Sequence, residues 1–297
     1  MNDEVVWKEH EIHRQMAEAA TDLPDEKDND DEDDNEPFIF DFFAKNEEDA
    51  YEYVDFDIPR LPHQQQTSPK LRIRGQFECT NSTGLGMWKG ADVLAEFLIQ
   101  NRDLIQNKRV LELGAGVGLC GLVAARLGAS HVIMTDGDTS VLSNMRYNIQ
   151  QNMIHPEDEP TESTENNNDN DQKEEKEEDN CHSKAVSRGG NVACHQLIWG
   201  RDLEDFVHEY GQQQVILATD CVYMTTSLQP LWQTVDALLD KGDGIFLFAN
   251  YCASQAPLEK ILDVATDHGF TWTHNEEDPE RDVYIFRHKM SGNTTRS

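Results

Sequence analysis

The amino-acid sequence predicts an α/β fold, in which helices flank a mostly parallel sheet, with disordered acidic segments outside it. From Lys108 onward, short apolar runs alternate with helical patterns, which is typical of βαβ units. A Gly-rich turn directly follows the first of these runs, as in nucleotide-binding α/β folds. By contrast, two long stretches hold Asp, Glu, Asn and Ser with almost no apolar side chain, so they cannot build a core.

The formal net charge of the chain is −32, and it is unevenly distributed. Residues 22–57 and 155–180 hold much of the acid, whereas residues 58–154 carry about as many basic as acidic groups. Binding to nucleic-acid phosphates requires clustered Lys and Arg, which this sequence lacks. We therefore expect no direct nucleic-acid partner.

Neither metal ligation nor a disulfide framework is indicated. The six cysteines are scattered without a Cys-x-x-Cys pair, and the eleven histidines, His195 and His208 among them, show no metal-site spacing. No apolar run reaches about 18 residues, and the N-terminus lacks the apolar region of a signal peptide. We expect a monomer without a metal or a membrane, in the cytoplasm, the nucleus or both.

Residues 1–57 are predicted to form an acidic, largely disordered arm. Within it, residues 5–20 have a helical pattern that suits either a marginal exposed helix or a partner-binding one. The aromatic cluster at 37–43 either docks on the folded domain or serves as a short linear motif. Residues 51–58 alternate as a strand does.

Residues 58–290 are predicted to form one folded domain. A disordered acidic insertion at 155–190 interrupts it, which is tolerated because the entropy of loop closure grows slowly with length. Residues 291–297 are a tail. We expect strands near 71–78, 110–113, 131–135, 214–219, 244–251, 270–274 and 283–288, the last two as an antiparallel hairpin, and we expect the domain to resume after the insertion at 191–199. We expect helices through 93–98 and at 117–127, 139–152, 203–210, 227–240 and 256–268.

The Gly-rich turn indicates a nucleoside-binding site. Gly114, Gly116 and Gly118 lie between a buried strand and a helix, where backbone N–H groups can approach a ligand without an intervening Cβ. Asp136 ends the next strand, where a carboxylate can bind both hydroxyls of a ribose. The alternative for Asp136 is to cap the following helix.

Two cofactor classes fit this turn. Gly116-x-Gly118-x-x-Gly121 matches the dinucleotide fingerprint, and Asp136 lies near the expected distance. Against an NAD site, Glu112 precedes Gly114 by two residues, and the chain ends in a hairpin instead of further parallel units.

Several segments together resemble the seven-β-strand S-adenosylmethionine-dependent methyltransferases. Within these, the chain is similar to methyltransferase family 16, the methyltransferase-like 21 type of protein lysine methyltransferases. The segments that carry the resemblance follow the family's order and are Trp88–Ala91, Val110–Gly118, Thr135–Asp136, Asn148 with Asn152, Leu197–Gly200 and Thr219–Tyr223.

The resemblance implies a methyltransferase domain whose sheet has the strand order 3-2-1-4-5-7-6, with strand seven antiparallel. It implies S-adenosylmethionine as cofactor, lying across the carboxyl ends of strands one, two and four. The cofactor-binding residues that it implies are Trp88, Glu112, Gly114, Ala115, Gly116, Gly118, Asp136, Trp199 and Thr219. Trp199 would pack on the adenine and Trp88 would close the site, although both rings also suit a core. Glu112 either orders the turn or contacts the amino end of the methionine.

The resemblance also implies a protein substrate, possibly basic, whose lysine accepts the methyl group. Asp220 and Tyr223 are the implied catalytic residues, the first orienting the amine and the second forming an aromatic wall. Alternatively, both simply terminate a strand. Other acceptors that the sequence leaves open are a histidine, an N-terminal amine or a small molecule. An inactive interaction module is a further alternative.

Overall fold

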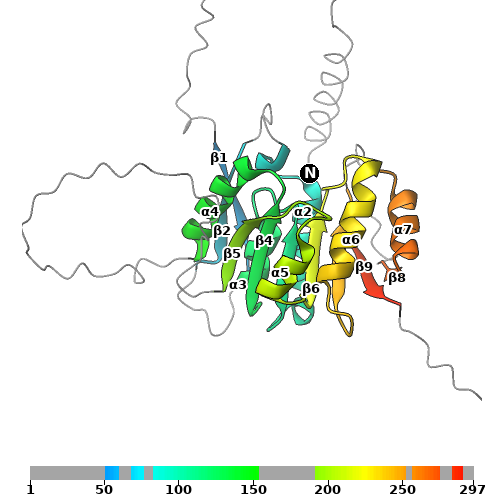
Figure 1. The fold of residues 1–297 in the computed structure, drawn as a ribbon. Coiled ribbons are helices and arrows are strands. Elements are labelled where there is room, and N and C mark those ends of the chain that lie inside the picture. Colours follow the sequence, from blue (N-terminus) through cyan, green and yellow to red (C-terminus); the bar gives the residue numbers. More distant parts are fainter. Residues whose placement is uncertain are drawn as a thin grey trace, which may run out of the picture. The chain divides into compact units, whose positions relative to one another are not determined.

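A seven-stranded sheet carries the described part of the chain. The computed structural model describes residues 51–59, 68–76, 83–153, 191–251, 256–274 and 283–289, which all belong to one unit, Lys45–Ser297 (Figure 1). Five sequence-based expectations lie outside these residues, namely the helix at 5–20, the acidic run 25–36, the aromatic cluster 37–43, the insertion 155–190 and the tail 291–297.

The sheet has the predicted topology. Its strands are β3 (Arg109–Leu113), β4 (His131–Asp136), β5 (Val192–Gln196), β6 (Val215–Thr219), β7 (Ile245–Ala249), β8 (Phe270–Thr273) and β9 (Val283–His288). They are ordered β5-β4-β3-β6-β7-β9-β8, which is 3-2-1-4-5-7-6 when β3 is counted as strand one. Strand β9 is antiparallel to both of its neighbours, and the pairs from β5 to β7 are parallel.

Helices cover both faces of this sheet. On one face lie α2 (Lys89–Gln100), α3 (Leu119–Arg126) and α4 (Thr139–Met153), and on the other lie α5 (Leu203–Tyr210), α6 (Leu228–Leu238) and α7 (Leu258–Asp267). Successive strand residues face opposite sides, so Val110 packs with the first group and Leu111 with the second. Each apolar face is thereby removed from water, as a parallel sheet requires.

A separate hairpin joins the first face. Strands β1 (Glu52–Asp57) and β2 (Lys70–Gly75) pair antiparallel, from Glu52 opposite Gly75 to Asp57 opposite Lys70. Because β1 is part of this folded pair, the folded unit begins before residue 58, earlier than the sequence predicted. The alternation of Val54 and Phe56 with acidic residues predicted the strand. The same acidic residues led us to assign this strand to the N-terminal arm instead of the domain.

Helix α4 binds the other edge of β2 through asparagine side chains. Asn148 accepts a hydrogen bond from Arg74 N at 2.9 Å and donates one to Arg74 O at 3.0 Å, as a neighbouring strand would. Asn152 repeats this with Arg72, at 2.8 and 3.0 Å. Asn148 also donates to the carbonyl of Val117 at 2.9 Å, so it connects the hairpin with the Gly-rich turn.

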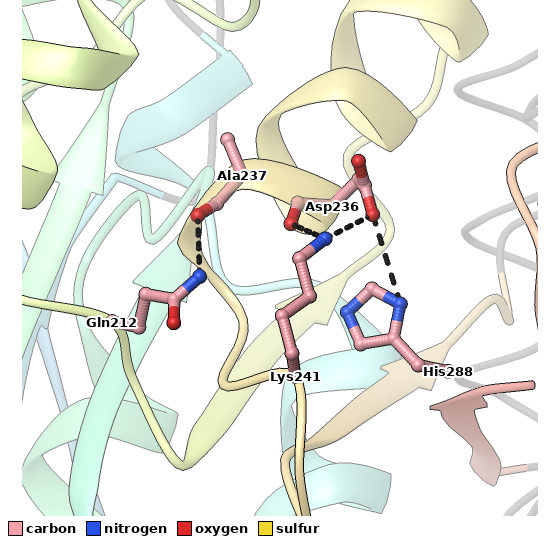
Figure 2. Close-up of polar contacts among 5 residues, drawn as sticks. All are labelled: Gln212, Asp236, Ala237, Lys241 and His288. Atoms are coloured by element: carbon pink, nitrogen blue, oxygen red, sulfur yellow. Dashed lines mark hydrogen bonds and ion pairs between the residues drawn. The ribbon is translucent and has the colours of Figure 1, made fainter. Parts of the chain in front are cut away.

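A polar cluster lies at the amino ends of β6 and β7, near the C-terminus of α6 (Figure 2). Lys241 donates to Asp236 Oδ1 at 2.5 Å and to the carbonyl of Asp236 at 2.6 Å, and His288 Nδ1 lies 3.6 Å from Asp236 Oδ1. Burial, reinforced by the charge of Lys241, lowers the pKa of His288. Gln212 donates to the carbonyl of Ala237 at 3.3 Å. Lys241 precedes β7 and Gln212 precedes β6, so this cluster fastens the amino ends of the strands, away from the carboxyl ends.

Among the described residues, no helix combines the length and apolar character needed to cross a membrane.

Candidate functional site

A cavity of about 540 Å³ opens at the carboxyl ends of the central strands. The turn after β3 forms its floor, Asp136 at the end of β4 lies to one side, and Thr219 at the end of β6 lies on the other. Ligand sites in open α/β sheets occupy this crevice, where the strand order reverses. Of the eleven predicted site residues, nine line it: Trp88, Gly114, Ala115, Gly116, Asp136, Trp199, Thr219, Asp220 and Tyr223.

The turn itself requires glycine. Gly114 and Gly116 have φ of 63° and 52°, in the left-handed region that disfavours other residues. A Cβ on Gly116 would lie 2.8 Å from the carbonyl oxygen of Gly84, and one on Gly114 would lie 2.9 Å from the Cβ of Cys221. The segment at Gly84 therefore lies directly against the turn, and neither contact leaves room for a side chain.

Asp136 holds the turn and faces the cavity. Its carboxylate accepts hydrogen bonds from Gly116 N and Asp138 N, both at 3.0 Å. Burial raises the pKa of Asp136, and these backbone donors partly offset the rise. The N-terminus of α4 is capped instead by Asp138, which accepts from Ser140 N at 2.9 Å. Asp136 is therefore available on its cavity side for a polar ligand.

Two tryptophans border the cavity from different segments. The ring of Trp199 lies over the turn, with Cζ2 3.6 Å from the position of a Cβ on Gly114. Trp88 directly precedes α2 and donates from Nε1 to the carbonyl of Thr83 at 2.9 Å. Both rings are only half-buried, so neither is an ordinary core aromatic.

Glu112 and Gly118 do not line the cavity, contrary to their predicted place among the cofactor contacts. Glu112 shares a face of β3 with Val110 and points toward α3, where its Oε2 accepts from Gly121 N at 2.8 Å. Burial raises the pKa of Glu112 to about 8. Gly118, with φ of 84°, begins α3 and donates to the carbonyl of Ala115 at 2.8 Å. Both residues order the turn from behind, which for Glu112 is one of the two roles that the sequence left open.

Asp220 connects three walls of the cavity. It follows β6 with φ of 41° and is only 1% exposed. Its Oδ2 accepts from Gly90 N at the start of α2, and its Oδ1 accepts from Tyr251 N after β7, both at 2.7 Å. Gly90 must be glycine here, because a Cβ would lie 2.5 Å from Oδ2. The carboxylate therefore fixes α2 and the end of β7 to the end of β6.

Tyr223 forms the outer side of the same corner. It is 40% exposed and lines the cavity. Its ring meets that of Trp88 edge to face, with centroids 6.1 Å apart and an interplanar angle of 62°. Asp220 and Tyr223 thus both face the cavity, the first buried and the second at its mouth.

Several lining residues were not predicted, among them Thr83, Gly84, Asp138, Arg201 and Cys221. Burial raises the pKa of the Cys221 thiol, as does the charge of Asp220. Asp138, Arg201 and Cys221 lie within two residues of predicted site residues, and this adjacency was the signal that could have found them. Among the described residues, no group of three His, Cys, Asp or Glu side chains could hold a metal ion.

Known proteins similar in sequence to this chain include several protein methyltransferases. It is 27% identical over 203 residues to the protein N-terminal and lysine N-methyltransferase EFM7 of Kluyveromyces lactis, covering 66% of this chain and 68% of that protein. It is also 27% identical to the protein N-lysine methyltransferase METTL21A of Danio rerio, covering 68% and 75%. For the protein-lysine N-methyltransferase EFM3 of Chaetomium thermophilum, the identity is 28%, and about half of that protein, 53%, is covered.

Solved structures with a similar chain fold include the magnesium protoporphyrin IX methyltransferase of Synechocystis with bound S-adenosylhomocysteine. Its TM-score is 0.44 at 12% identity, with 67% of this chain and 82% of that chain covered. At this identity the similarity says nothing about the acceptor. A family model described as lysine methyltransferase matches residues 65–165 and 166–256. The chain therefore belongs to the lysine methyltransferase family, whose members are S-adenosylmethionine-dependent enzymes.

Proposed function

We propose that this chain transfers the methyl group of S-adenosylmethionine to the side-chain amine of a lysine in a protein substrate. The observation that carries this proposal is that the Gly-rich turn, Asp136, Asp220 and Tyr223 all line one cavity. One end of it suits a nucleoside and the other opens to a partner.

The residues of the cavity fit the cofactor. Its volume of about 540 Å³ lies in the range of small-molecule sites. Gly114 and Gly116 leave no Cβ between the turn and a ligand, as a methionine and ribose passing close to the backbone require. Asp136 offers a half-buried carboxylate for the ribose hydroxyls, and Trp199 offers an aromatic face for the adenine.

Each remaining residue has a place in this assignment. Ala115 lines the cavity floor, where the methionine and ribose would lie, and Thr219 lines the cavity at the end of β6, where its backbone would border the cofactor. Trp88, held by its hydrogen bond to Thr83, closes the site from the N-terminal side. Glu112 and Gly118 act indirectly by keeping the turn and the start of α3 in place.

When bound, S-adenosylmethionine supplies a methyl group attached to a sulfonium sulfur. The work of the protein is to position an amine lone pair in line with that methyl group and to exclude water. A lysine must arrive uncharged, although its ordinary pKa is about 10.4. The positive charge of the adjacent sulfonium and removal of the amine from water would both lower the pKa of the lysine and favour the neutral amine.

Asp220 has the opposite electrostatic effect on the amine. A carboxylate near the amine raises its pKa, so we assign Asp220 to orientation instead of proton removal. Its two hydrogen bonds to backbone N–H groups hold the charge in place. Asp220→Ala should abolish methyl transfer and leave the dissociation constant for S-adenosylhomocysteine within a few-fold, as isothermal titration can measure.

The decisive experiment incubates the purified protein with isotopically labelled S-adenosylmethionine and a cofactor-depleted cell extract, followed by mass spectrometry of digested proteins. We expect the label on lysine side chains. Label on histidine, on N-terminal amines or only on small molecules would identify another acceptor. No label, with S-adenosylhomocysteine binding intact, would indicate an interaction module. Binding of NAD instead of S-adenosylhomocysteine would refute the cofactor assignment.

Three finer expectations stay predictions. The net charge of −32 supports a basic partner, because acidic segments attract positive charge over a distance that salt shortens. Deleting residues 155–190 should then lower kcat/KM at low salt, with a smaller difference at high salt. A monomer and a cytoplasmic or nuclear location are tested by light scattering and by imaging of a tagged chain.

A further inference from the structure

Several exposed apolar side chains belong to residues that line the cavity or contact a residue that lines it. Among the described residues, the large hydrophobic side chains with high exposure are Tyr53 (44%), Ile198 (44%), Tyr223 (40%), Met224 (63%) and Tyr251 (48%). Of these, Tyr53 belongs to the β1–β2 hairpin. Ile198 and Tyr223 line the cavity itself. Water-exposed apolar groups that gather beside a pocket indicate a surface for a partner.

Tyr223, Met224 and Tyr251, here called the apolar rim, lie on the acceptor side. Met224 follows Tyr223 directly, and the backbone N of Tyr251 bonds to Asp220 at 2.7 Å. Asp220 thereby holds the end of β7 beside the end of β6. Tyr251, which follows β7, is thus kept near Tyr223 and Met224, which follow β6. Trp88 adjoins them through its edge-to-face contact with Tyr223.

The rim offers little to a positively charged neighbour. It consists of two tyrosines and a methionine, with no acidic or basic side chain. Asp220, whose carboxylate bonds to the backbone N of Tyr251, is 1% exposed and also bonded to the backbone N of Gly90. Its charge therefore acts inside the cavity and not on the surface around it. A partner residue that lies on the rim gains most by removing apolar area from water.

We propose that the apolar rim binds the protein segment that carries the acceptor lysine, and that this segment places an apolar side chain next to the lysine. The inference rests on the proposed function and deepens it. Long-range attraction of a basic partner by the acidic segments is compatible with it, because that attraction acts before contact, whereas the rim selects the residues in contact.

Charge reversal at Met224 separates apolar contact from charge selection. Either charge on the rim must be desolvated when an apolar segment binds, so Met224→Glu and Met224→Lys should both lower methylation of extract proteins, by about tenfold. If the lysine instead has basic neighbours, Met224→Glu should raise methylation and Met224→Lys should lower it. Methylation is measured with tritiated S-adenosylmethionine and a cofactor-depleted cell extract.

A pair of tyrosine variants adds a second test of the rim and its matched control. Tyr251→Ala should lower methylation as the Met224 variants do, and Tyr53→Ala, which removes a similarly exposed ring that does not line the cavity, should not. Affinity for S-adenosylhomocysteine should stay unchanged in all four variants. Opposite effects of the two Met224 charges, wild-type activity of the rim variants, or an equal loss in Tyr53→Ala would overturn the inference and leave the proposed function standing. No labelled lysine with the unaltered protein would refute the proposed function itself.

Discussion

Replacing Asp220 by Asn tests the connection on which the acceptor corner depends. Both residue types tolerate the left-handed φ of 41°, so the substitution adds no backbone strain. It changes one carboxylate oxygen to an amide NH2 group. Asn can still accept from either Gly90 N or Tyr251 N, but at the other position two donors then face each other.

The cost follows from these two bonds. A hydrogen bond to a charged group contributes about 1.5–3 kcal/mol, and a buried donor left without an acceptor costs about 1–3 kcal/mol. Loss of one bond and weakening of the other therefore lower the free energy of unfolding by about 2–5 kcal/mol. For a domain of this size, each kcal/mol corresponds to a shift in Tm of about 2–4 °C, so we expect Tm to fall by roughly 5–15 °C.

Urea denaturation and differential scanning calorimetry of the full chain measure this change. Asp202→Asn is the matched control, because Asp202 also has a left-handed φ, of 52°, but is exposed. Its free energy of unfolding should change by less than about 0.5 kcal/mol. Gly90→Ala disrupts the same contact from the other side, since its Cβ would lie 2.5 Å from Asp220 Oδ2.

The losses in Asp220→Asn and Gly90→Ala should therefore be less than additive in the double variant. Equal stability of Asp220→Asn and Asp202→Asn would show that the connection contributes nothing, and full additivity would show that the two residues act separately.

Three further predictions concern residues that support the cavity. Asn148→Ala should lower the free energy of unfolding by about 1–3 kcal/mol in urea titrations, because it leaves the Arg74 N–H without this acceptor, while the Arg74 carbonyl keeps its hydrogen bond from Asn144 at 2.9 Å; an unchanged midpoint would contradict the role of Asn148. The folded-state pKa of Glu112, about 8, lies above its ordinary 4.5, so folding takes up a proton between these values, and its contribution to stability falls as pH rises through that window. Glu112→Gln should therefore flatten the decline in stability between pH 5.5 and 8.5, whereas an identical slope would place the proton elsewhere. Gly116→Ala should weaken S-adenosylhomocysteine binding at least tenfold in calorimetry, because it adds both strain and a 2.8 Å contact with the Gly84 carbonyl oxygen. Gly211→Ala also places a Cβ on a residue with positive φ, but no atom lies within 4 Å of that position, so it should lower stability and leave S-adenosylhomocysteine binding unchanged. Equal binding by the two variants would show that the contact between residue 116 and the Gly84 carbonyl does not matter for binding.

The sequence placed the secondary structure closely because local periodicity carries it. The expected strands at 110–113 and 131–135 became β3 and β4, and the expected helix at 203–210 is α5. The turn and Asp136 were found for the same reason, since a strand, a glycine turn and the next strand are close in the sequence. Glu112 shows the limit, because its position beside the turn was evident but its direction, toward α3, depends on which face of β3 meets that helix.

What the sequence alone determined is therefore the α/β class, the order of the elements and nine residues that line the cavity, Asp220 and Tyr223 among them. These depend on neighbouring residues and on a family pattern that keeps its order along the chain. Only the tertiary structure decided which distant segments of the chain meet. It brings Gly90 to Asp220 across 130 positions and Arg74 to Asn148 across 74, and it gathers the apolar rim at one corner. Such contacts arise from the packing of α2 and α4 against the sheet, and no local pattern of side chains encodes which distant backbone group a buried side chain will meet.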